Sequence, residues 1–187
     1  MKTTTFRHFL VESGKIQRDF SSVQLNLSEG LANEIISWGG HRIPEKSVFF
    51  NPDRPKFGRE ENIHITILYG IESTNPKVVS ELLEGRKPFE VKLGNMSLFT
   101  NNNAFDVLKI EVLSPDLHDL NSILTKNLNV IQTYPEYVPH VTIAYLKKDK
   151  GHDYSGCQKF NGRKFEVSEI IFASKSGSKH NLKLGEK

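Results

Sequence analysis

The stretch that decides the fold is PHVTIAYL at residues 139–146, because residues 63–70 carry a second copy of its pattern, IHITILYG. In both copies a histidine is followed by an aliphatic residue, a threonine, an isoleucine, a variable apolar residue and a tyrosine. β-Branched and aromatic residues favour strands, so each copy predicts a strand of about six to eight residues. Because side chains alternate between the two faces of a strand, each histidine should lie beside its threonine. Tyr69 and Tyr145 are then expected on the opposite, buried face.

The two copies supply four candidate catalytic residues, His64, Thr66, His140 and Thr142. With an ordinary imidazole pKa near ~6.5, one ring can accept a proton while the other donates one. Cleavage of a ribose phosphodiester needs both events, and threonine hydroxyls can donate to the phosphate oxygens on which charge grows. A pair of structural core histidines is the alternative. A zinc site is disfavoured, because each copy offers one ligand and the sequence suggests no third carboxylate or thiol.

The composition is that of an ordinary globular chain. Its 187 residues, 37% hydrophobic and 25% charged, suffice for one domain or two small lobes with a shared core. A net charge of +3 suits an anionic substrate but is too small to predict a nucleic-acid coat. The one cysteine, Cys157, excludes an internal disulfide and favours the reducing cytoplasm. No apolar run approaches ~18 residues, so we predict no membrane span. We also predict no obligate protein partner.

The order strand, helix, histidine strand occurs twice and indicates a divergent duplication. Residues 22–27 alternate as a strand, and a helix capped by Ser28 should end at Gly39-Gly40 before the first histidine strand. Residues 105–113 and a helix after Ser114-Pro115 repeat this order before the second one. The other predicted elements are a helix opened by Asn75-Pro76, strands at 89–93, 96–100 and 165–173, and a short element at 182–184.

Two segments stand outside the repeated pattern. Residues 1–19 are predicted to be an N-terminal arm, and residues 20–187 a single bilobal domain. Residues 39–62 contain three prolines and lead directly into the first histidine strand. Long irregular stretches in compact domains are usually functional or disordered, so we predict a lid over the cleft.

Four further residues are candidates for substrate binding. Phe57 in the lid could clamp a base, and Arg59 could reach a second phosphate. Tyr137, just before the second histidine, could stack on a base, and Lys175 could present its ammonium group to an anion. Packing is the alternative for the two aromatic residues, and an ordinary solvated position is the alternative for the two cations.

The paired His-x-Thr strands, set in a duplicated strand–helix–strand order, resemble the 2H phosphoesterase superfamily. That superfamily includes the bacterial RNA 2′,3′-cyclic phosphodiesterases, also called 2′-5′ RNA ligases, and phage enzymes that degrade cyclic-nucleotide immune signals. The resemblance covers residues 20–184 and implies that both histidines are catalytic, that both threonines hold phosphate and that no cofactor is needed. It implies an α+β, bilobal, duplicated fold with two antiparallel sheets flanking a central cleft and helices packed outside. Residues 58–60 are similar to phage-encoded members, whereas the long 39–62 segment departs from the compact RNA-processing enzymes.

We therefore predict a metal-independent phosphodiesterase acting on a cyclic oligonucleotide signal, in the host cytoplasm if the chain is phage-encoded. The 2′,3′-cyclic end of RNA is the alternative substrate. A non-catalytic module that binds a nucleotide or an RNA end is disfavoured, because arginine or lysine would serve binding alone. A virion component is a third possibility, suggested only by the N-terminal arm. Which histidine is the acid and which the base stays open at this point.

Overall fold

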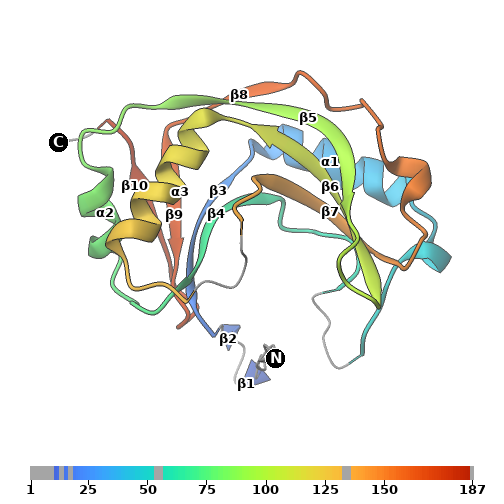
Figure 1. Ribbon diagram of the computed structural model, residues 1–187, viewed down its shortest axis with the longest axis horizontal. Coiled ribbons are helices and arrows are strands. Elements are labelled where there is room, and N and C mark those ends of the chain that lie inside the picture. Colours follow the sequence, from blue (N-terminus) through green and yellow to red (C-terminus); the bar gives the residue numbers. More distant parts are fainter. Residues whose placement is uncertain (1–10, 13–14, 17–18, 53–56, 132–135, 186–187) are drawn as a thin grey trace.

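One curved antiparallel sheet of eight strands organises the chain (Figure 1). The computed structural model describes residues 11–12, 15–16, 19–52, 57–131 and 136–185. The strands of the sheet are β3 (Ser21–Asn26), β4 (His64–Ile71), β5 (Phe89–Phe99), β6 (Phe105–Leu113), β7 (His140–Lys147), β8 (Lys164–Val167), β9 (Glu169–Ala173) and β10 (Lys179–Lys183). They lie in the order β10-β9-β3-β4-β7-β6-β5-β8. The α-helices are α1 (Glu29–Arg42), α2 (Lys77–Leu83) and α3 (Pro115–Asn127), and short 3-10 helices occupy Glu45–Ser47 and His152–Tyr154.

The predicted duplication is visible in the order of the elements: β3, α1 and β4 form one half, and β6, α3 and β7 the other. The two histidine strands pair directly with each other, through Ile65 and Val141. The expected two sheets are therefore joined as one curled half-barrel, which corrects that part of the prediction. The physical reason is that the strand at the inner edge of each half has unpaired backbone N–H and C=O groups. By pairing, β4 and β7 supply hydrogen-bond partners to each other.

Beyond this pair, on the edge that faces β4, β7 takes its backbone partners from the segment that precedes β4, while its other edge pairs with β6. The Glu60 N–H donates to Ile143 O at 2.8 Å, and the Tyr145 N–H donates to Gly58 O at 2.7 Å. Phe49 also donates its N–H to Tyr145 O at 2.9 Å. Where the structure describes it, the segment predicted as a lid is thus bonded to β7 at Phe49, Gly58 and Glu60.

Each long helix packs against the histidine strand of the other half. α1 lies on β7, where a Cβ added at Gly39 would come within 3.3 Å of Ile143 Cγ2. α3 lies on β4, and the Asn121 side-chain amide donates to Ile67 O at 2.7 Å. This exchange of helices ties the two halves into one core. The prediction that α1 ends at Gly39-Gly40 is wrong, because the helix continues to Arg42. Gly39 lies inside the helix and lets it pack closely on Ile143.

Two other predicted boundaries are corrected. The strands expected at 89–93 and 96–100 are one strand, β5, whose register with β6 shifts between Leu93 and Met96. The strand expected at 165–173 is two strands, β8 and β9, which pair with β5 and β3 in different halves. Of the predicted N-terminal arm, residues 1–19, the structure describes residue 19 and the strands β1 (Val11–Glu12) and β2 (Lys15–Ile16), which pair with each other. Among the described residues, no helix is long and apolar enough to cross a membrane.

A β-bulge in each histidine strand determines where the tyrosines lie. One extra residue, Ile67 in β4 and Ile143 in β7, interrupts the register with the neighbouring strand. An extra residue shifts the alternation of side chains by one position. The burial pattern changes at the same place in both strands, so Tyr69 and Tyr145 share the face of the histidines and threonines. Their predicted position on the opposite face is wrong.

Candidate active site

The four predicted catalytic residues surround Ile65 and Val141, the residues through which β4 pairs with β7. In the antiparallel register set by Ile65 and Val141, His64 lies across from Thr142 and His140 lies across from Thr66. Alternation turns all four side chains to one face, and each residue is half-buried. Side chains directly opposite each other in this way have Cβ atoms about 5 Å apart. The structure therefore brings the two motifs into one site, as their spacing predicted.

Both histidines are held by the same hydrogen bond. His64 Nδ1 lies 2.5 Å from the carbonyl oxygen of Asn62, and His140 Nδ1 lies 2.6 Å from that of Val138. A carbonyl oxygen can only accept, so Nδ1 carries the hydrogen in each ring. Nε2 is consequently the atom that gains and loses a proton. The carbonyls thus fix the tautomer and the ring orientation of both histidines.

His140 lies in an environment that favours its neutral form. Burial lowers the pKa of His140, the charges of Lys109 and His64 lower it further, and the hydrogen bond to Val138 opposes this only in part. The Phe99 ring packs edge-on against the imidazole, with centroids 4.9 Å apart. A neutral ring with a bare Nε2 is a proton acceptor.

The strands that flank the histidine strands carry matched positions with different chemistry. On β3, Gln24 pairs with Thr66 and Asn26 pairs with His64. On β6, Lys109 pairs with Thr142 and Glu111 pairs with His140. Gln24 is buried and its side-chain nitrogen has no partner among the described residues. Sequence reasoning missed these four residues, because they become neighbours of the site only through cross-strand register.

Two of the predicted substrate-binding residues lie in the segment along β7. The Arg59 guanidinium donates to the Glu45 carboxylate at 2.5 Å and to Ile43 O at 2.6 Å, which anchors the segment to the region after α1. The Phe57 ring packs against Phe105 and Tyr145, with centroids 5.0 and 5.1 Å away. Phe57 thus belongs to an aromatic cluster that includes Tyr145, which lies on β7 five positions beyond His140.

The other two candidates lie in different surroundings. Tyr137 donates its hydroxyl hydrogen to the backbone oxygen of Thr66 at 3.3 Å and so supports the first motif. Burial raises the pKa of Tyr137 above the ordinary range. Lys175 follows β9, and its N–H donates to Ser21 Oγ at 3.0 Å. Ser21 and Asn26 are opposite ends of β3, about 17 Å apart at the rise of a strand, and Asn26 is the end that pairs with His64. The structure does not bring Lys175 together with the histidines.

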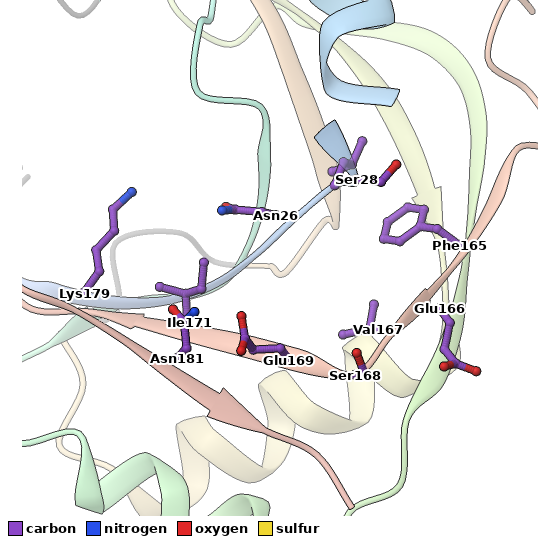
Figure 2. A pocket seen from close by; sticks show the side chains of 11 residues that line it. Asn26, Ser28, Phe165, Glu166, Val167, Ser168, Glu169, Ile171, Lys179 and Asn181 are labelled. Atoms are coloured by element: carbon purple, nitrogen blue, oxygen red, sulfur yellow. The ribbon is translucent and has the colours of Figure 1, made fainter. Parts of the chain in front are cut away.

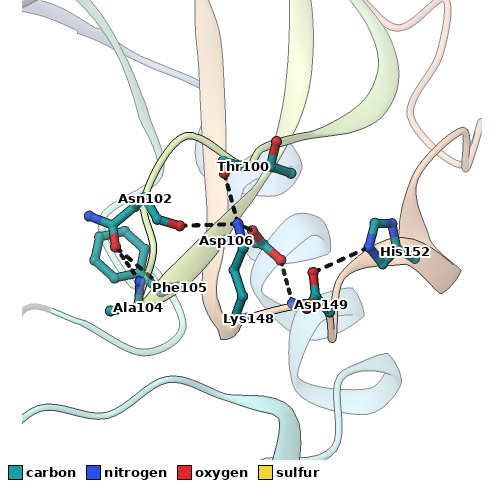
Figure 3. Close-up of polar contacts among 8 residues, drawn as sticks. All are labelled: Thr100, Asn102, Ala104, Phe105, Asp106, Lys148, Asp149 and His152. Carbon is teal, nitrogen blue, oxygen red and sulfur yellow. Dashed lines mark hydrogen bonds and ion pairs between the residues drawn. The ribbon is translucent and has the colours of Figure 1, made fainter.

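A buried carboxylate, Asp106, lies near the aromatic cluster and forms several hydrogen bonds (Figure 3). Asp106 is fully buried and accepts from Lys148 Nζ at 2.8 Å and from the Asp149 N–H at 2.7 Å. Lys148 also donates to the carbonyl oxygens of Thr100 and Asn102. These bonds tie the β5–β6 turn to the end of β7. They fix the strand position from which the neighbouring residue, Phe105, enters the cluster.

A cavity of about 410 Å³ lies beside the first half, between the end of β3, the β8–β9 junction and β10 (Figure 2). Asn26, the cross-strand partner of His64, lines it, as do Ser28, Glu169 and Asn181. A second cavity of about 410 Å³ lies between the end of β4 and helices α2 and α3. None of the four predicted catalytic residues lines either of these two cavities; the first one adjoins them through Asn26, the cross-strand partner of His64.

The described residues form no cluster suited to a metal ion: nowhere among them do three or more His, Cys, Asp or Glu side chains gather as a ligand set. That metal is unnecessary for activity stays a prediction.

Comparisons with known proteins identify related sequences and folds. The family model of the 2′-5′ RNA ligase superfamily matches residues 50–178. An RNA 2′,3′-cyclic phosphodiesterase from Methanothermobacter thermautotrophicus is 29% identical over 107 residues, which cover 52% of this chain and 58% of the relative. The chain therefore aligns with less than two thirds of that relative's length.

Solved structures show the same fold at low sequence identity. TT0787 of Thermus thermophilus has a TM-score of 0.62 at 13% identity, covering 90% of this chain and 99% of that one. E. coli LigT complexed with 3′-AMP has a TM-score of 0.58 at 16% identity, covering 88% and 94%. Usb1 of Kluyveromyces marxianus with uridine monophosphate has a TM-score of 0.53 at 13% identity, covering 90% and 99%.

Proposed function

The chain belongs to the 2′-5′ RNA ligase superfamily, part of the 2H phosphoesterases, and we propose on this basis that it hydrolyses a nucleotide phosphodiester through His64 and His140. The observation that carries the proposal is the register at Ile65 and Val141, which surrounds one backbone pair with two imidazoles and two hydroxyls. A phosphate over that pair would be within reach of all four side chains.

In the proposed reaction, Nε2 of one histidine takes a proton from the attacking water while the water oxygen bonds to phosphorus. The bond from phosphorus to the leaving oxygen breaks, and the other histidine donates its Nε2 proton to that oxygen. The two rings exchange protonation states, and exchange with solvent restores them. Thr66 and Thr142 donate hydrogen bonds to the non-bridging oxygens, where negative charge increases in the transition state. We propose that neither metal nor cofactor takes part, because imidazolium supplies the positive charge.

The substrate we favour is a ribose 2′,3′-cyclic phosphate, on a nucleotide or at an RNA end. This follows the printed function of the archaeal relative. A cyclic oligonucleotide signal, such as one degraded by a phage enzyme, is the second candidate. The cavity reached through Asn26 favours it, since about 410 Å³ beside His64 could accept a further nucleoside. In either case we place the activity in the cytoplasm.

We further propose that the segment along β7 covers bound substrate and that Phe57 contacts a base. Its ring lies in the aromatic cluster beside Tyr145, on the strand of His140. The same arrangement leaves Arg59 a supporting role, since Glu45 and Ile43 already occupy its guanidinium. The Phe57→Leu variant tests this: the KM for a nucleotide substrate should rise several-fold while kcat changes little.

The experiment that tests the function is incubation with 2′,3′-cyclic mononucleotides, cyclic di- and trinucleotides, and 2′-5′ oligoadenylates, read by mass spectrometry. Wild-type protein should add one water to at least one class, and His64→Ala and His140→Ala should not. His41→Ala is the matched control, because His41 is exposed on α1. Cleavage confined to the cyclic mononucleotides selects the first substrate, and cleavage confined to cyclic oligonucleotides selects the second. A wild-type protein that leaves every class intact would refute the proposal.

A further inference from the structure

The duplication provides an internal comparison between the two halves of the site. Gln24 on β3 and Lys109 on β6 are equivalent positions, because each pairs with the threonine of its histidine motif, just beyond a β-bulge. Both side chains are buried. One half therefore has a neutral amide where the other has a cation, although the motifs themselves are the same.

The Lys109 ammonium is buried near His140, and among the described residues it forms no salt bridge. Its Nζ donates to Ser97 Oγ at 2.6 Å and lies 4.5 Å from the centroid of the Phe99 ring, whose edge contact with His140 is described above. Lysine is rarely buried unless it is paired, since removing its charge from water is costly. Burial lowers the pKa of Lys109, and Glu111 opposes this effect. A hydroxyl and an aromatic ring give little compensation, so a structural role alone is a poor explanation for this lysine.

Two charged groups on β6 distinguish the halves around His140, because Lys109 stands where β3 has Gln24 and Glu111 stands where β3 has Asn26. His64 faces His140 from β4, and Glu111 pairs with it from β6. The Glu111 carboxylate turns toward β5, where its Oε2 would lie 3.6 Å from a Cβ built at Gly94. From β5 itself, His140 meets the uncharged Phe99 ring.

We propose that Lys109 is a positioning residue that makes the two histidines unequal, keeping His140 in the neutral, proton-accepting form and leaving His64 to donate the proton. This assignment of roles rests on the proposed function. The charge of Lys109 acts on His140 and not on the substrate directly. Lowering of the His140 pKa by Lys109 agrees with this arrangement.

The test is an NMR titration of the imidazole signals in the full-length protein, with the pH dependence of kcat/KM beside it. Lys109→Gln introduces the residue that occupies the equivalent position, 24, in the other half. It should raise the His140 titration midpoint by about 0.5 to 1 pH unit, the size expected for one nearby charge. The acidic limb of the kcat/KM profile should move by the same amount. Lys109→Arg keeps the charge and should stay close to wild type. Lys147→Gln removes an exposed cation from the end of β7 and should change neither.

An unchanged or lowered His140 midpoint in folded Lys109→Gln would overturn the proposal, and so would equal shifts of His64 and His140. If Lys109→Gln does not fold, the comparison of Lys109→Met with Lys109→Arg gives the same readout. The titration needs no substrate, so its failure is distinct from failure of the proposed function. A protein that cleaves but shows no shift contradicts the role of Lys109, whereas a shift without cleavage contradicts the function.

Discussion

Ile65 of β4 pairs with Val141 of β7, and this single pair is where the two copies of the His-x-Thr motif meet. The pair lies between the histidine and the threonine of both motifs. An antiparallel register therefore sets each histidine across from the other motif's threonine. The site is built from two halves that are each incomplete, and it depends on the contact between them.

The neutral state of His140 has a consequence for the pH dependence of the reaction. Because burial and neighbouring charge lower the pKa of His140, this proposed base should stay deprotonated below the ordinary imidazole value. The acidic limb of kcat/KM should accordingly lie below pH ~6.5, and loss of the proton donor at higher pH should give a bell shape. Stopped assays from about pH 4.5 to 9 measure this, a range that spans the ordinary imidazole value. An acidic limb above pH ~6.5, or a monotonic rise, would contradict it.

The two threonines should matter for the rate more than for stability. Thr66→Val and Thr142→Val remove a hydroxyl from half-buried positions at nearly constant volume. Losing one donor to the transition-state oxygen should reduce kcat by about 10- to 100-fold, somewhat less than loss of a rigid oxyanion donor. Steady-state kinetics and a thermal melt on the same samples separate the two effects. Thr100→Val is the control, and wild-type kcat in both variants would disprove phosphate binding by these hydroxyls.

Chelation should leave the proposed activity intact. The site combines imidazoles with neutral hydroxyls, and the described residues provide no third ligand of the kind that zinc prefers. Rates measured before and after dialysis against EDTA should agree within error. A loss that added zinc or magnesium restores would mean that the reaction requires a metal.

The Asp106 network should contribute to the free energy of unfolding. Asp106→Asn keeps the shape but removes the charge that holds Lys148 and the Asp149 N–H. Because the carboxylate is fully buried while Lys148 is partly exposed, we expect a loss of about 2 kcal/mol, below the range for wholly buried pairs. Urea denaturation measures it. Asp119→Asn breaks the exposed pair with Arg86 and should cost under about 1 kcal/mol; equal losses in both variants would contradict the structural role of Asp106.

Local pattern predicted much of the fold and the motif residues of the site. Alternation and β-branching located β3, β4, β6 and β7, and the apolar stripe of α3 needed no tertiary information. The bulges at Ile67 and Ile143 were missed, since a bulge is a relation between two strands and leaves no mark in one of them. The same limit hid Lys109, which reads in sequence as an ordinary strand lysine.

Three other errors have separate structural causes. Gly39 was interpreted as a helix terminator, but it lies inside α1, where a smaller residue allows close contact with Ile143. The break at Ser168 between β8 and β9 was missed because apolar residues continue on both sides of it. Sequence pattern also could not place Lys175, whose position depends on how β9 pairs with β3.

The most direct measurement of the central claim is kcat/KM for His64→Ala and His140→Ala, separately and together, on whichever substrate the wild-type protein cleaves. Each single substitution should lower kcat/KM by about 10²- to 10⁴-fold, the double variant should lose far less than the product of the two, and His41→Ala should match wild type. If either single variant keeps the wild-type rate, or if the two losses multiply as for independent sites, the histidines do not act on one phosphate and the account fails.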